Sequence, residues 1–141
     1  MQWRFTNPKF DLLPVSDLVQ LFPLNEEAAF FLWDSVRAFF LPREQSLNRK
    51  SFKSFLELEL DGLGVSEIQK WLRQRGLMMN DTLYLSWNQE EAMQVPGSLF
   101  VKYFDSFYYS ASDDLTVFDE SLNWILNCVH YHQLSYGLTL N

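Results

Sequence analysis

The sequence has few of the residues that mark secreted, disordered or low-complexity proteins. Its 141 residues include one cysteine, five glycines and five prolines. A single cysteine, Cys128, cannot form an internal disulfide, which favours a reducing compartment. The scarcity of glycine and proline, together with thirteen phenylalanines, excludes wholesale disorder. A chain of this length can bury a substantial core, so we expect residues 1–141 to form one domain.

Two other absences bear on where the protein works. The amino terminus has no continuous apolar run after Arg4, so it does not resemble a secretory signal peptide. Residues 122–141 contain no Asp, Glu, Lys or Arg, yet Asn123, Asn127 and Gln133 interrupt any apolar run that would cross a membrane. We therefore expect a cytoplasmic protein with no membrane partner.

Positive charge is absent from the carboxyl-terminal part of the chain. All eleven Lys and Arg residues lie at or before Lys102, and the formal net charge is −7. The acids beyond that point are Asp105, Asp113, Asp114, Asp119 and Glu120. Such a field repels phosphates, so we expect no nucleic-acid partner, and it attracts a basic protein surface. The plainer interpretation is that acidic turns keep an aromatic-rich region soluble.

The amino-terminal part of the chain is predicted to be helical. A short helix over residues 17–22 precedes a longer one over 26–40, which Asn25 can cap. The longer helix has a stripe of apolar residues at helical spacing, and further apolar surface is added by Phe30, Phe31 and Phe39. We therefore expect it to be covered on more than one side, by the sheet and another helix.

Two further segments follow. Residues 52–61 alternate apolar and acidic residues as a half-buried strand does, but their apolar residues also fit one side of a helix. We favour helix, because Leu, Glu and Lys are good helix formers and no β-branched residue occurs there. Another helix is predicted between a capping box of Ser66 and Gln69 and a stop at Gly76.

The carboxyl-terminal region has the two-residue periodicity and the aromatic and β-branched composition of strands. Predicted strands cover residues 82–87, 104–110, 115–118, 124–131 and 134–138. Most of their connections are too short for a crossover, so antiparallel pairing is expected. Asn88 is predicted to start one or two helical turns that end before Pro96. The predicted fold class is α+β, with N-terminal helices packed on a C-terminal antiparallel sheet of about four to five strands.

The strongest candidate for a binding surface combines acids and tyrosines. Asp113 and Asp114 precede one predicted strand, and Tyr108 and Tyr109 lie near the end of the strand before it. Tyrosines on an exposed sheet face, rimmed by acids, have the composition of a protein-binding surface. We therefore predict a non-enzymatic interaction module in which these four residues bind a basic protein partner. The alternative is that the rings pack inward on the helices.

A second interpretation is a small hydrolase or metal-binding protein that uses Asp113, Asp114, His130 and His132. Carboxylates and imidazoles ligate transition metals, and Cys128 shares the predicted strand face with both histidines. The spacing matches no established metal motif, and no neighbouring Lys or Arg would lower the pKa of the thiol. We therefore assign no catalytic residue, no metal ligand and no cofactor.

A third interpretation is a small-molecule pocket between helices and sheet, lined by Trp33, Trp71 and Trp124. A nucleotide is not the expected ligand, because the sequence has no glycine-rich phosphate loop. The basic segment 43–53 can attract an acidic ligand, although such runs are more often solvated loops.

Several carboxyl-terminal motifs resemble those of a family of small bacterial proteins of unknown function. They are FDSFYYS at 104–110 and SDDLTV at 112–117, followed by Trp124-Ile125-Leu126, His130-Tyr131-His132 and Tyr136-Gly137. The resemblance covers the last third of the chain and implies no activity, because the family has none assigned. In size, acidity and sheet layout the chain is also similar to toxin-neutralising immunity proteins, a likeness of class alone.

Overall fold

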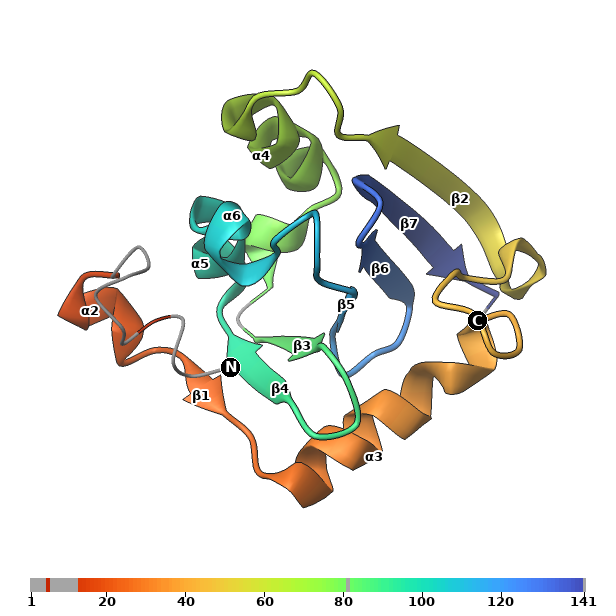
Figure 1. The fold of residues 1–141 in the computed structure, drawn as a ribbon, viewed down its shortest axis with the longest axis horizontal. Helices are drawn as coiled ribbons and strands as arrows, with labels where there is room; N and C mark the ends of the chain where they lie inside the picture. Colours follow the sequence, from red (N-terminus) through yellow and green to blue (C-terminus); the bar gives the residue numbers. More distant parts are fainter. Residues whose placement is uncertain (1–4, 6–12, 81, 141) are drawn as a thin grey trace.

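The computed structural model describes residue 5 and residues 13–80 and 82–140. Within these residues, seven antiparallel strands form one sheet in the order β1-β4-β3-β5-β6-β7-β2 (Figure 1). The strands are β1 (Phe22–Pro23), β2 (Phe52–Glu59), β3 (Leu83–Ser86), β4 (Ala92–Val95), β5 (Leu115–Phe118), β6 (Trp124–Val129) and β7 (Gln133–Thr139). The helices are α2 (Val15–Leu18), α3 (Glu26–Val36), α4 (Val65–Gln74), α5 (Gly97–Lys102) and α6 (Phe104–Phe107), with 3-10 turns at Arg37–Phe39, Arg49–Ser51 and Leu77–Met79.

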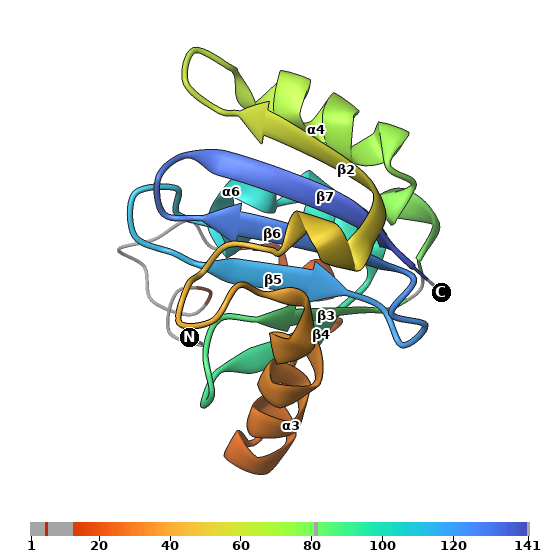
Figure 2. The ribbon, with the colours of Figure 1, turned by 90° about the vertical axis from the view of Figure 1, so that its right-hand side faces the viewer.

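Helices lie on both faces of the sheet (Figure 1 and Figure 2). The sheet bends around α4, α5 and α6, which cover what we call its inner face, and α3 lies on the outer face. Successive residues of a strand point to opposite faces, so in β6 Leu126 joins the inner core and Ile125 the outer core. Every residue of β5 and β6 is buried for this reason.

α3 begins where the sequence predicts. The Asn25 side chain accepts a hydrogen bond from the Ala28 N–H at 2.9 Å, which confirms the predicted cap. The buried residues of the helix are Ala29, Leu32 and Val36. Phe31 is 71% exposed. The expectation that this helix is covered on more than one side is therefore wrong, because its buried stripe packs on the sheet and leaves Phe31 in solvent.

The α+β class is confirmed, but the predicted order of helices before sheet is wrong. Helices and strands alternate along the chain, and the sheet has seven strands rather than four or five. Residues 104–110 begin with helix α6 instead of forming a strand. The Phe100 ring centroid lies 5.9 Å from those of both Phe104 and Phe107. A spacing of four and seven residues is helical, so packing of these rings in the inner core overrode their strand-like composition.

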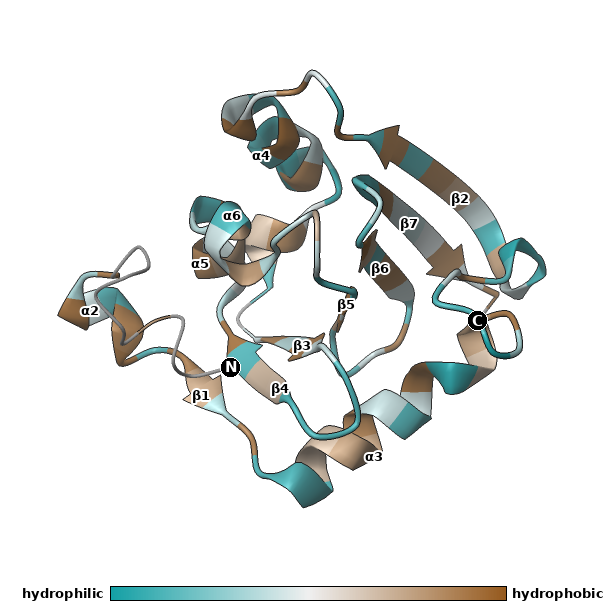
Figure 3. Ribbon diagram, in the orientation of Figure 1, coloured by the Kyte–Doolittle hydropathy of each residue, from teal (hydrophilic) through white to brown (hydrophobic). Residues whose placement is uncertain are grey.

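Residues 52–61 contain strand β2 and not the predicted helix. β2 pairs antiparallel with β7 along its length. Hydrophobic and hydrophilic residues alternate along much of it (Figure 3). Leu58 packs against the inner core and Phe55 against the outer core. Residues 52–59 form a strand because they pair with the distant strand β7. Helix propensity depends on local sequence and takes no account of such pairing.

The turn chemistry was predicted only in part. The left-handed φ of Gly76, 84°, confirms the predicted stop after α4. The N-cap of α4 is Gly64 rather than Ser66, and the Gln69 amide donates to two backbone carbonyls of α5, both at 3.1 Å. Asn88 Oδ1 accepts from two backbone N–H groups and closes the turn before β4 instead of starting a helix.

Candidate functional site

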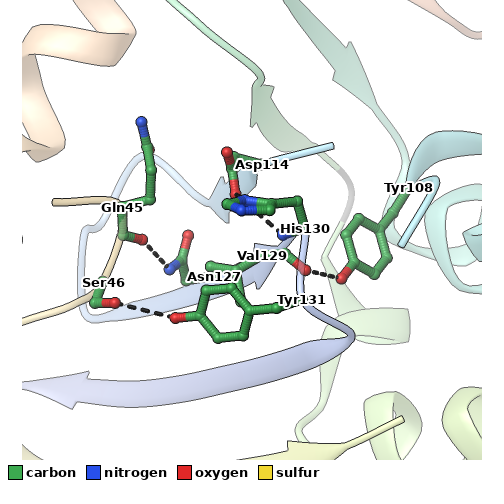
Figure 4. A network of polar contacts seen from close by, with 8 residues as sticks. All are labelled: Gln45, Ser46, Tyr108, Asp114, Asn127, Val129, His130 and Tyr131. Carbon is green, nitrogen blue, oxygen red and sulfur yellow. Dashed lines mark hydrogen bonds and ion pairs between the residues drawn. The ribbon is translucent and has the colours of Figure 1, made fainter. Parts of the chain in front are cut away.

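Tyr108, one of the four predicted binding residues, is buried beside the end of β6 (Figure 4). It is 3% exposed, and its hydroxyl donates a hydrogen bond to the Val129 carbonyl. Burial raises the pKa of this phenol. Its ring centroid lies 5.5 Å from that of Phe104 in the inner core. The expectation that Tyr108 lies on an exposed surface is therefore wrong, because the turn after α6 places its ring inside.

The two predicted aspartates hold the segment before β5 in place. Asp113 Oδ2 accepts a hydrogen bond from the Tyr109 N–H at 2.8 Å. Asp114 Oδ1 accepts one from the His130 N–H at 3.1 Å and lies 2.9 Å from His130 Nδ1. Tyr109, Asp113 and Asp114 are all half-buried. Each aspartate thus has a structural contact, and the binding role of these three residues stays a prediction.

The structure brings together only part of the predicted metal or hydrolase site. Asp114 contacts His130, whereas Cys128 belongs to the inner core and is 0% exposed. Burial, with a contribution from the charge of Asp113, raises the pKa of the Cys128 thiol. In the part of the chain that the structure describes, no three His, Cys, Asp or Glu side chains are grouped to hold a metal ion. Cys128 is thus a core residue rather than a nucleophile.

The three tryptophans of the third interpretation do not share a pocket. Trp33 lies on α3 at the outer face, where its ring centroid is 5.9 Å from that of Phe30. Trp71 and Trp124 pack at the inner core, and Trp124 stacks on Tyr136 at 5.7 Å. The sheet separates Trp33 from the other two, so this interpretation is wrong.

A groove that the sequence did not reveal lies over β1, β3 and β4. It consists of three adjoining hollows of about 260, 380 and 500 Å³, and Gln94 of β4 lines all three. We call it the outer groove and describe it by six of its lining residues: Phe22, Glu27, Phe31, Tyr84, Asp119 and Glu120.

Two exposed phenylalanine rings stand in the outer groove. Phe22 is 59% exposed and Phe31 is 71% exposed. Phe22 belongs to edge strand β1 and not to the predicted helix over 17–22. The signal that points to Phe31 is its place off the buried stripe of α3, at a position where a polar residue is expected. Large exposed apolar side chains gathered in a hollow mark interaction surfaces.

Acidic side chains border the outer groove. Glu27 lines one hollow and Asp119 and Glu120 line another, and the described lining residues include no Lys or Arg. Asp119 accepts hydrogen bonds from Asn80 Nδ2 at 2.9 Å and Trp124 Nε1 at 3.0 Å. Burial acts to raise the pKa of Asp119, but the hydrogen bonds that it accepts outweigh burial and lower the pKa. Asp119 is therefore negatively charged at neutral pH.

No protein-family model, curated protein or solved structure matches this chain. None of the described helices combines the length and the apolar character that a membrane crossing requires. A functional assignment therefore rests on the geometry of the chain itself.

Proposed function

We propose that the chain is a non-enzymatic interaction module of the cytoplasm that binds a basic protein partner through the outer groove. The observation that supports this most is Phe31, which is 71% exposed and lines a hollow of about 500 Å³. Aromatic side chains that bury on association dominate the energetics of protein interfaces. Phe22 offers a second such ring on β1.

The charges of the groove favour a basic partner over an acidic or neutral one. Glu27 lines the same hollow as Phe31, Asp119 and Glu120 line the adjoining hollow, and no described lining residue is a cation. The whole chain has a net charge of −7, which attracts a basic surface before contact is made. The rings then supply contact area, and the acids supply steering and register.

The acids of the carboxyl-terminal region divide into two groups. Asp113 and Asp114 precede β5, and Asp119 and Glu120 follow it. Five residue steps along an extended chain put roughly 16 Å between Asp114 and Asp119. In this proposal the second group contacts the partner, while the first adds to the long-range field. Tyr108, which is buried, makes no contact with the partner.

The partner is expected to dock by its side chains rather than by adding a strand to the sheet. β1 forms the edge of the sheet beside the groove and contains two residues. Pro23 has no backbone N–H to offer, so a strand added there would gain few hydrogen bonds. A Lys or Arg side chain of the partner can instead lie over an exposed ring and between the acids.

A toxin-neutralising immunity protein is one form of this function, because such a protein binds its toxin without catalysis. A basic toxin is the corresponding partner.

Capture of partners from the native cytoplasm on immobilised protein, with identification by mass spectrometry, tests the proposal. We expect a basic protein that the wild type and Phe30→Ser retain and that Phe31→Ser releases. Phe30→Ser is the matched control, because Phe30 lies on the same helix, is 50% exposed and does not line the groove. Equal capture by the two variants, or capture of acidic proteins alone, would contradict the proposal.

Rate measurements on the captured partner separate the role of the charges from that of the rings. Glu27→Gln combined with Glu120→Gln should slow association at low salt and flatten its salt dependence. Phe31→Ser should instead speed dissociation, since it removes an anchor. Asp113→Asn combined with Asp114→Asn should slow association less than the groove pair does. If none of these charge changes alters the association rate, electrostatic steering of the partner does not occur.

A second function, that of a small hydrolase or metal-binding protein, is favoured by the contact between Asp114 and His130. A carboxylate that orients a histidine occurs in catalytic triads and in metal centres. The buried Cys128 does not complete such a site. Elemental analysis of the purified protein discriminates the two functions: stoichiometric zinc or manganese that is lost in His130→Ala would favour the second.

A further inference from the structure

A row of polar residues crosses the outer face of the sheet. Its members are opposite one another in the strand register: Ser86 and Thr116, Thr116 and Asn127, Asn127 and Ser135, Ser135 and Glu57. The first four are at most 9% exposed. Among the described residues, Arg75 Nε is the only fully buried side-chain polar atom without a hydrogen-bond partner, so the polar atoms of this row that form no hydrogen bond reach the surface.

The row reaches a pocket of about 400 Å³ that lies between the sheet and the segment 41–50. We call it the loop pocket, and three members of the row line it: Glu57, Ser135 and Asn127. The segment crosses in front of β6 in Figure 2. The loop pocket shares no lining residue with the outer groove, so the two sites are separate.

The Asn127 amide has a defined orientation. Its Nδ2 donates a hydrogen bond to the Gln45 carbonyl at 2.8 Å, and a carbonyl only accepts (Figure 4). Asn127 Oδ1 is therefore the acceptor of this side chain. Neither that oxygen nor the Ser135 hydroxyl forms a hydrogen bond with another described residue. Neither atom is fully buried, so both are accessible to a ligand in the loop pocket.

Charges of both signs lie side by side at the loop pocket. The Arg49 guanidinium forms an ion pair with the Glu57 carboxylate and lies over the Phe55 ring, 4.8 Å from its centroid. Gln133 Nε2 donates to Glu57 at 2.9 Å and keeps the carboxylate in place. Lys50 also lines the pocket. One small ligand can therefore reach a cation and an anion at the same time.

We propose that the loop pocket binds a free α-amino acid with an apolar side chain. An ammonium group has three donors and no acceptor, and Glu57, Ser135 and Asn127 present acceptors along one row. A carboxylate suits the planar fork of Arg49, which can make two parallel hydrogen bonds to it. The two charged groups of an α-amino acid are separated by one carbon, so one ligand can reach both Arg49 and Glu57 once their direct ion pair opens to admit it.

The rest of the lining accounts for the apolar side chain. The apolar residues of the pocket are Leu41, Leu47, Phe55, Val129 and Tyr131. Tyr131 is held at the wall by its hydroxyl, which lies 3.1 Å from Ser46 Oγ. A ligand with one charge matches the pocket less well, because an anion would also face Glu57 and a cation would also face Arg49.

Isothermal titration calorimetry of the full chain with L-leucine and L-phenylalanine tests this proposal. N-acetyl-L-leucine lacks the ammonium group, and L-leucinamide lacks the carboxylate. We expect at least one of the two amino acids to bind, and the two analogues to bind at least about threefold more weakly than L-leucine, because the Arg49 and Glu57 side chains are 65% and 33% exposed and a charge pair in such a place contributes less than a buried one. Absence of binding by both amino acids at millimolar concentration, or equal binding by the analogues, would overturn the proposal. These arms use the wild type alone and do not depend on the folding of a variant.

A pair of variants locates the site. Glu57→Gln keeps the shape of the side chain and removes the charge opposite the ammonium, so it should weaken L-leucine binding by a similar factor. Glu59→Gln is the matched control, because Glu59 also accepts from Gln133 but does not line the pocket. Equal loss of affinity in both variants would overturn the assignment to this pocket. A negative result here would not contradict the function proposed for the outer groove, because the two sites share no lining residue.

Discussion

The Phe52 ring lies directly over Gly137 on the neighbouring strand. A Cβ added at residue 137 would come 2.4 Å from the Phe52 ring, which is far inside van der Waals contact. The register of β2 against β7 shifts between Phe52 and Ser54. Phe52 is part of the outer core, so the glycine allows the core to close against β7. It thereby supports the strand that carries Glu57 to the loop pocket.

Gly137→Ala should therefore lower the free energy of unfolding by about 1–3 kcal/mol, the usual cost of overpacking a core. The added methyl group meets the Phe52 ring, so the same change should cost less in a Phe52→Leu background. Urea unfolding of the wild type, both single variants and the double variant measures this coupling. Strictly additive effects would show that the ring is not the obstacle.

Tyr108→Phe should destabilise the fold by about 0.5–1.5 kcal/mol, because the Val129 carbonyl loses its hydrogen-bond donor. The matched control is Tyr131→Phe, at a tyrosine that is 49% exposed, and it should stay within about 0.5 kcal/mol of the wild type. Urea unfolding measures both. A loss of partner binding in Tyr108→Phe without any loss of stability would contradict the structural role of this residue.

Asp119→Asn should lower the free energy of unfolding at pH 7 by about 1–3 kcal/mol, because the hydrogen bonds that the carboxylate accepts are weakened. The pKa of Asp119 is lowered in the folded state. Its contribution is thus fully present above the ordinary pKa of about 3.9 and is lost as the pH falls through the folded pKa. Unfolding measured at pH 7 and pH 3 should show the effect shrinking. Glu120→Gln, its exposed neighbour, should change stability by less than about 0.5 kcal/mol at either pH.

Cys128 should resist thiol reagents as long as the protein is folded. It is 0% exposed, and burial raises the pKa of its thiol. Labelling with a chromogenic disulfide in native buffer should be slow and limited by opening of the structure, whereas labelling in denaturing urea should be fast. Immediate reaction of the native protein would show an accessible thiol and would revive the catalytic interpretation.

The strands in which residue pattern and burial agree were predicted in the right places, although β6 ends at Val129 and not at Tyr131 as predicted. Residues of β5 and β6 alternate between two buried faces, and Asn25 caps α3 with its own side chain, so local sequence contains the information. Secondary structure predicted from amino-acid composition was wrong in two segments whose conformation depends on long-range contacts. The aromatic residues 104–110 read as a strand, yet two of the rings pack at helical spacing against Phe100. Residues 52–61 contain good helix formers, yet β7 pairs with them.

The predicted site was recovered less well than the fold. Asp114 and His130 were grouped correctly, because a turn and a neighbouring strand end meet in any antiparallel arrangement. The predicted exposure of Tyr108 was wrong, because the alternation of residues along a strand does not show which face of the sheet is covered. The polar row of the loop pocket was missed, because it becomes visible only when the register of five strands is known.

The acidic charge, the absence of cations after Lys102 and the alternation of the central strands can all be read from the residues alone. These properties depend on residue identity and on spacing between near neighbours. Which acids line the outer groove together with exposed rings depends instead on how the elements pack. β5 places Asp114 and Asp119 at opposite ends, and α3 packs against β3 and β4 with Phe31 exposed. Such relations join segments that are distant along the chain, so no local pattern records them.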